Sequence, residues 1–145
     1  MIRRTLLLVA LVAALACGHK TRPLAPELVL PEAPSEIVAA STADGVQLTW
    51  KRPDRYTGGK QMNDLGGFVI ERASGDVGSA GFARIGDLQL DDRGRFRKER
   101  RISWTDTSAV PGENYMYRVT AVTTDDYTSA PGGPVTIRYQ RKAAR

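Results

Sequence analysis

Reactive side chains are scarce in this sequence, which contains one cysteine, Cys17, and one histidine, His19. A single cysteine cannot form a disulfide within the chain, and a single histidine cannot build a zinc site with several histidine ligands. A Ser-His-Asp triad would need its histidine in the folded body, whereas His19 lies near the N-terminus. The sequence therefore predicts a protein that is not an enzyme and that holds no metal and no cofactor.

Two kinds of short motif could still bind ions or phosphate. The acidic doublets Asp91–Asp92 and Asp125–Asp126 lack the spacing of a calcium-binding loop, and aspartate is common in turns. The pairs Gly58–Gly59 and Gly66–Gly67 enclose a loop and do not lead from a strand into a helix, as a phosphate-binding loop would. All four motifs are therefore interpreted as turn and loop residues.

The net charge of the chain is +5, from 21 basic and 16 acidic side chains, and the acidic residues are scattered along the whole sequence. A nucleic-acid-binding protein usually presents a basic face interleaved with aromatic residues that stack on bases. The sequence lacks this pattern, so we expect no nucleic-acid partner.

The first 16 residues have the pattern of an export signal. Arg3 and Arg4 form a positive N-terminal region, and the apolar stretch Leu6–Ala16 follows them. This stretch has 11 residues, whereas a transmembrane helix needs roughly 20. Residues 1–16 are therefore predicted to be a signal peptide.

Cys17 ends this apolar stretch, directly after Ala14–Ala16. An unpaired thiol in an exported protein is prone to oxidation and to pairing between molecules, and lipidation removes that liability.

The stretch Leu15-Ala16-Cys17-Gly18 resembles the lipobox of bacterial lipoproteins. In that family the cysteine receives a diacylglyceryl thioether, the chain is cut before it, and the new amine is acylated, for example with palmitate. The resemblance implies lipid attachment at Cys17 and a place in the bacterial cell envelope, in the outer rather than the inner membrane. A secreted protein cut at the same bond is the alternative.

Residues 17–33 are predicted to be a tether, because prolines fix φ and favour an extended chain. Its start, Cys17–Lys20 followed by Pro23–Leu24, resembles that of small Gram-negative envelope lipoproteins. One of these is associated with assembly of the lipopolysaccharide translocon. This resemblance implies an alternative function, an assembly factor that acts through its lipidated N-terminus near lipopolysaccharide-export machinery.

The rest of the chain consists of short segments of alternating polarity separated by Gly, Pro, Asp and Ser clusters, which predicts an all-β domain. The clearest segment is Tyr115–Val122, in which every second residue lies on one apolar face. Seven strands are expected within 34–140: Glu36–Ala40, Val46–Trp50, Phe68–Ala73, Phe82–Leu88, Arg101–Asp106, Tyr115–Val122 and Val135–Tyr139. This number predicts an immunoglobulin-like sandwich, with 141–145 as a basic tail.

A second resemblance covers the whole domain. The motifs Ala33-Pro34, Val46-x-Leu48-x-Trp50-x-x-Pro53, Phe68-x-Ile70-x-Arg72, Pro111-Gly112-x-x-Tyr115-x-Tyr117-x-Val119-x-Ala121 and Ser129 occur in the order typical of a fibronectin type III domain. The resemblance implies that Trp50 is a core residue and that the hydroxyl of Tyr115 bonds to backbone upstream, as a tyrosine corner. The family usually has a leucine at the position of Ala109. Trp104, on the preceding strand, is expected to fill the space that the smaller alanine leaves. The expected core residues are Trp50, Phe68, Ile70, Trp104, Tyr115, Tyr117 and Val119.

Two surface features are candidate binding sites. The loop Lys51–Gly67 is long and polar, with Tyr56 and Met62 expected to be exposed. The run Arg93–Arg101 is basic and consists of Arg93, Arg95, Arg97, Lys98, Arg100 and Arg101, with Phe96 and Glu99 among them. It is either a solvated hairpin or charged edge strand, or a segment attracted to anionic head groups or lipopolysaccharide phosphates. Such attraction contributes about 1 kcal/mol per basic residue near a charged surface.

Together these features predict an envelope lipoprotein anchored in the membrane through Cys17. Its fibronectin type III-like domain is expected to act as a non-catalytic binding or structural module. The partner is expected to be an envelope protein or a glycan, and the sequence does not distinguish the two.

Overall fold

The computed structural model describes residues 25–75, 81–95 and 100–143. The predicted signal peptide, Cys17, Arg97 and Lys98 fall outside these residues, so the expectations for them stay predictions. Within the described ranges, no helix is both long enough and apolar enough to cross a membrane.

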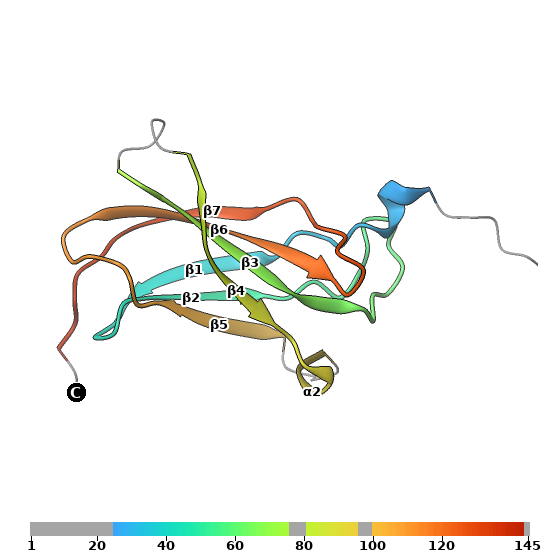
Figure 1. Cartoon of the computed structure of the whole chain (residues 1–145), viewed down its shortest axis with the longest axis horizontal. Coiled ribbons are helices and arrows are strands. Elements are labelled where there is room, and N and C mark those ends of the chain that lie inside the picture. The colour runs from blue at the N-terminus through green and yellow to red at the C-terminus, as the bar shows by residue number, and fades with distance from the viewer. Residues whose placement is uncertain (1–24, 76–80, 96–99, 144–145) are drawn as a thin grey trace, which may run out of the picture.

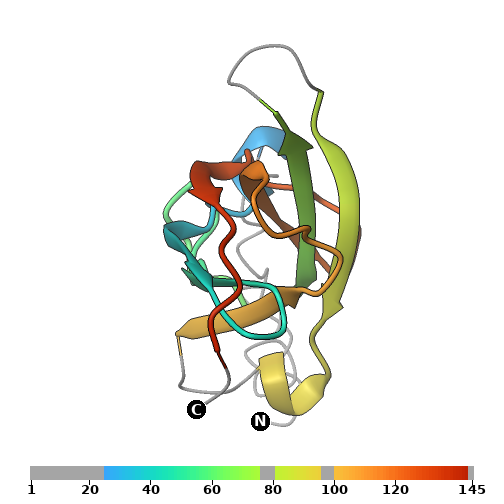
Figure 2. The same cartoon turned by 90° about the vertical axis from the view of Figure 1, so that its left-hand side faces the viewer.

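Seven strands form two antiparallel sheets that pack face to face (Figures 1 and 2). One sheet has the order β1-β2-β5 and the other the order β4-β3-β6-β7. The strands are β1 (Ser35–Ser41), β2 (Val46–Lys51), β3 (Leu65–Ser74), β4 (Ala83–Gln89), β5 (Arg101–Asp106), β6 (Asn114–Thr123) and β7 (Gly132–Arg138). The predicted seven-stranded sandwich is confirmed, with strand ends shifted by a few residues.

Two short helical elements complete the described chain. They are the 3-10 helix η1 (Pro26–Val29) and the α-helix α2 (Asp92–Arg95). Each has four residues, which is about one turn and too short to produce a helical period in the sequence.

Alternation along the strands builds the core between the sheets. On β2, Val46, Leu48 and Trp50 are fully buried, while Gln47 between them is exposed. The ring of Trp50 packs edge-on against Phe68 of β3, with centroids 5.2 Å apart. The other expected core residues Ile70, Tyr115, Tyr117 and Val119 are at most 3 % exposed.

Trp104 lies at the edge of the sandwich and is partly buried. Its indole covers Gly86 of β4, where an added Cβ would come within 2.5 Å of the ring. The ring therefore connects β5 to the edge of the opposite sheet. Ala109 is itself a buried core residue, 8 % exposed.

Tyr115 fixes the turn that precedes β6. Its hydroxyl accepts a hydrogen bond from the backbone N–H of Val110, at 2.9 Å. The guanidinium of Arg72 lies over its ring, 4.8 Å from the centroid. This geometry matches the tyrosine corner that the sequence resemblance implies.

Replacing Tyr115 by phenylalanine should lower the free energy of unfolding by about 1–3 kcal/mol, because it leaves the Val110 N–H without its acceptor. Urea denaturation followed by circular dichroism measures the loss. Tyr127→Phe is the matched control, since Tyr127 is 45 % exposed. Equal stability of the two variants would contradict the role given to the Tyr115 hydroxyl.

The chain before β1 does not form a free tether up to Ala33. Pro31 is buried, and the backbone carbonyl of Leu30 accepts a hydrogen bond from Thr57 in the β2–β3 loop, residues 52–64, at 2.9 Å. The N–H of Glu32 donates to the carbonyl of Arg55 at 3.0 Å. The carbonyl groups of an extended, proline-containing segment form no hydrogen bonds within the segment. Here they accept hydrogen bonds from backbone N–H groups of the β2–β3 loop. The described segment around η1 thus belongs with the domain.

Candidate functional site

The β2–β3 loop does not present the two side chains expected on its surface. Met62 is 8 % exposed and belongs to the core, so the expectation of an exposed Met62 is wrong. Tyr56 is partly buried, and its hydroxyl donates a hydrogen bond to Asp64 at 2.6 Å. Burial, together with this bond, raises the pKa of Tyr56 to about 12. Both side chains hold the loop to the domain because each has an apolar part that is more stable in the core than in water.

Three described residues of the basic run, Arg95, Arg100 and Arg101, form ion pairs within the domain. Arg100 pairs with Asp54 at 3.0 Å, and Arg101 pairs with Glu36 at 2.7 Å. Arg101 lies on β5, which pairs only with β2 and is therefore an edge strand. These contacts support the interpretation as a charged edge strand, and attraction of the run to anionic head groups stays a prediction.

Helix α2, which carries Arg93 and Arg95, is held at both ends. Asp91 accepts a hydrogen bond from the Gly94 N–H at 2.6 Å and so caps the start of the helix. Arg52 of the β2–β3 loop donates to the carbonyl groups of Gly94 and Arg95, at 2.8 and 2.6 Å. Burial lowers the pKa of Arg52, although Asp54 opposes this shift. Arg52 therefore positions the backbone of Arg95.

A buried ionic cluster lies at the end of β5 and was not expected from the sequence. Asp106 is 2 % exposed and accepts hydrogen bonds from Arg72 at 2.7 Å and from the hydroxyl of Tyr117 at 2.8 Å. The backbone N–H and the hydroxyl of Ser108 donate to its other oxygen at 2.9 and 2.7 Å. Burial alone would raise the pKa of Asp106, but the hydrogen bonds from Ser108, Tyr117 and Arg72 outweigh it and lower the pKa. Because both carboxylate oxygens are engaged, the cluster is suited to stabilising the fold rather than to proton transfer.

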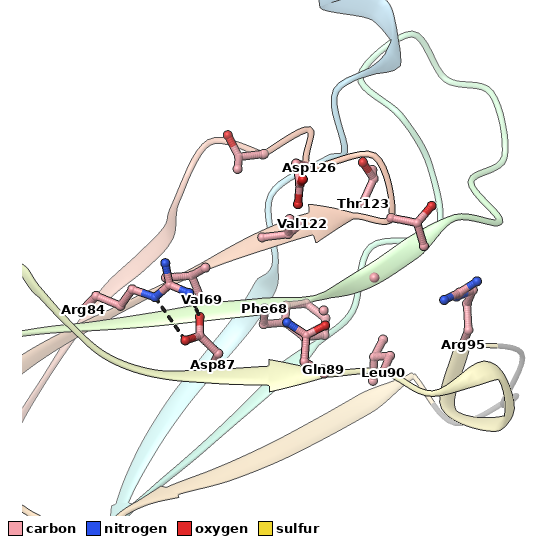
Figure 3. A pocket seen from close by; sticks show the side chains of 14 residues that line it. Phe68, Val69, Arg84, Asp87, Gln89, Leu90, Arg95, Val122, Thr123 and Asp126 are labelled. Atoms are coloured by element: carbon pink, nitrogen blue, oxygen red, sulfur yellow. Dashed lines mark hydrogen bonds and ion pairs between the residues drawn. The ribbon is translucent and has the colours of Figure 1, made fainter.

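A hollow of about 440 Å³ lies over one end of the β4-β3-β6 surface (Figure 3). Its lining includes Gly66 and Gly67 of β3, where an added Cβ on Gly67 would collide with the carbonyl oxygen of Leu88. Gly67 pairs with Gln89 on one neighbouring strand and with Val122 on the other. The packing of the sheet therefore requires glycine at this position, because the Leu88 carbonyl occupies the place of a side chain.

Charged and polar side chains surround the hollow. Arg84 and Asp87 form an ion pair on β4, while Arg95 reaches the hollow from α2 (Figure 3). Asp126 and Thr128 border it from the turn between β6 and β7. In the described ranges, no group of three or more His, Cys, Asp or Glu residues could hold a metal ion.

Two features of the sequence lie at this hollow, Arg95 of the basic run and the pair Gly66–Gly67. The sequence predicts Gly66–Gly67 at the end of a flexible loop, whereas the structure places both residues inside β3. Consecutive glycines next to apolar strand residues are typical of a bulge or of a close approach by another backbone. A register shift between Leu65 and Gly67 in the pairing with β6 fits that pattern.

The strand order and the packing of the two sheets define a seven-stranded, immunoglobulin-like sandwich of the fibronectin type III class. The sequence matches no protein-family model and none of the curated proteins. Solved structures do resemble it. The third fibronectin III domain of the human KIAA0343 protein has a TM-score of 0.53 and 10 % identity, over 88 % of this chain and 97 % of that chain.

The twitchin kinase region from C. elegans (Fn31-NL-kin-CRD-Ig26) has a TM-score of 0.56 and 18 % identity. The match covers 80 % of this chain but only 18 % of that chain, so it concerns a single part of the larger protein. An Fn3-like protein from Clostridium thermocellum has a TM-score of 0.48 and 15 % identity, over 79 % of this chain and 98 % of that chain. The human structure confirms the predicted fibronectin type III fold.

Proposed function

We propose that the chain is a membrane-anchored envelope lipoprotein whose fibronectin type III-like domain acts as a non-catalytic binding or structural module. The observation that carries the proposal is the position of the only thiol in the chain. The described sandwich contains no cysteine, and Cys17 lies eight residues before Ala25, where the described chain begins. A thiol with no part in the fold and directly behind an apolar leader is suited to lipid attachment.

The fold supports a particular orientation of an anchored domain. η1 lies at one end of the sandwich, and the C-terminal chain leaves from the other end (Figure 1). Eight extended residue steps from Cys17 to Ala25 span at most about 28 Å. A lipid on Cys17 would therefore hold the end with η1 and the β2–β3 loop near the bilayer. Two or three acyl chains on one residue provide a stable anchor, whereas a single chain gives only marginal binding.

The proposal predicts that growth with alkyne-tagged palmitate labels the wild-type chain and that Cys17→Ser abolishes the label. Serine keeps a hydroxyl in place of the thiol and cannot form the thioether. Lys20→Gln is the matched control, because it changes the same segment and keeps Cys17. The labelled chain is detected by in-gel fluorescence. An unlabelled wild type, or a label that survives Cys17→Ser, would contradict the proposal.

A further inference from the structure

We propose that the hollow over Gly66 and Gly67 binds an extended peptide segment of a partner protein, which presents a carboxylate to Arg95. This inference deepens the proposed function and rests on it, since it assigns a partner class and a site to the binding module. Arg95 of the basic run and Gly66–Gly67 at the end of the polar loop, both singled out in the sequence, line this hollow.

The shape of the hollow fits a main chain that lies on the sheet. Its volume of about 440 Å³ is within the range of roughly 300–1,000 Å³ typical of ligand sites. Gly66 and Gly67 carry no side chains, so this part of the lining is formed by the strand backbone. Val69 and Val122 add apolar surface, which suits the small side chains of a peptide.

The guanidinium of Arg95 is incompletely bonded. Its Nε is buried without a hydrogen-bond partner among the described residues. The nearest acidic oxygen, on Asp92, is 3.6 Å from Nη1, and the Asp92 side chain is 89 % exposed. An unsatisfied buried donor is unfavourable, and a carboxylate is the group that satisfies a guanidinium best. The Arg95 side chain is 23 % exposed, so a ligand carboxylate would bind at the part that solvent reaches and not at the buried Nε.

The remaining groups favour a peptide over other partners. Among the described residues, the side chains of Gln89, Asp126 and Thr128 have no hydrogen-bond partner, and together they offer donors and acceptors for peptide groups. The lining carries two arginines, Arg84 and Arg95, and two aspartates, so its charge is balanced and does not suit a polyanion.

A glycan is disfavoured because the described lining has no aromatic face on which a sugar ring could stack. Its one aromatic residue, Phe68, is 2 % exposed and packs against Trp50 in the core. The hollow therefore matches a peptide with both amide groups and an acidic group.

The test uses the full chain in a neutral detergent and a phage library of random linear octapeptides. We expect the enriched peptides to share an Asp, a Glu or a free C-terminal carboxylate. Synthetic copies of an enriched peptide are then titrated by fluorescence anisotropy against the wild type and its variants. Arg95→Gln should weaken binding at least tenfold. The matched control Arg93→Gln, on the same helix but outside the lining, should change binding less than twofold.

A second variant fills the hollow and keeps the fold. Gln89→Trp places a ring over Gly67 on the neighbouring strand, an arrangement that stabilises glycine-containing sheets. It should abolish binding and leave the melting temperature unchanged. Should Gln89→Trp lower the melting temperature, Thr128→Trp fills the hollow from the opposite side instead.

The absence of any enriched peptide, enrichment of peptides without a carboxylate, or equal binding by wild type and Arg95→Gln would overturn the inference. These results are independent of palmitate labelling at Cys17. A labelled chain without peptide binding would thus disprove the peptide site and leave the anchor proposal intact. Peptide binding by an unlabelled chain would disprove the anchor and support the site.

Discussion

Replacing Trp50 by alanine is expected to lower the free energy of unfolding by about 3–5 kcal/mol, the range for truncation of a large aromatic core residue. Trp50 is fully buried on β2 and packs against Phe68 of the opposite sheet. Its removal leaves a cavity between the sheets. The chain has a single cysteine, so no disulfide within it can offset this loss.

Urea denaturation followed by far-ultraviolet circular dichroism measures the effect of Trp50→Ala. Val38→Ala is the matched control, because Val38 lies on a strand of the same sheet but is 54 % exposed. We expect the control to stay within about 0.5 kcal/mol of the wild type. An unchanged midpoint for Trp50→Ala would disprove its assignment as a core residue.

Replacing Asp106 by alanine should have an effect of similar size, about 3–5 kcal/mol, because it removes one partner of a buried ion pair. Arg72 and the hydroxyl of Tyr117 would lose their shared acceptor. Asp87→Ala is the matched control. Its pair with Arg84 is exposed, so the loss should be at most about 1 kcal/mol. Equal losses in the two variants would contradict the role of the cluster.

The contribution of Asp106 should also depend on pH. Its pKa is lower in the folded chain than the ordinary value of 3.8, so the folded state binds the proton less tightly than the unfolded state. The stabilisation is complete above 3.8 and disappears as the pH falls through the folded-state pKa. The stability difference between wild type and Asp106→Ala should therefore shrink below pH 3.8. A difference that stays constant down to pH 2 would contradict this account.

The fold was largely predictable, because local alternation determines which face of each strand is buried. Val46, Leu48 and Trp50 alternate with polar residues, and the structure buries all three. Gly86 shows the limit of this approach. It lies under Trp104, and no pattern within β4 reveals the ring that covers it.

The candidate site was much less predictable, because it depends on contacts between distant segments. Asp106 meets Arg72 from another sheet, 34 positions away in the chain. Met62 looked like an exposed loop residue, yet its neighbours in space place it in the core. The hollow requires Gly67, Arg95 and Asp126 to come together from β3, α2 and the β6–β7 turn. Such contacts between distant segments depend on the tertiary fold, so the local periodicity of the sequence does not predict them.

The proposed anchor is tested most directly by the intact mass of the N-terminal peptide released by protease from membrane fractions. We predict a peptide that begins at Cys17 and carries the added mass of a diacylglyceryl group and one further acyl chain. This single mass reports both cleavage after Ala16 and the presence of lipid. A peptide that begins at Cys17 without added mass, or one that still begins at Met1, would contradict the lipoprotein proposal.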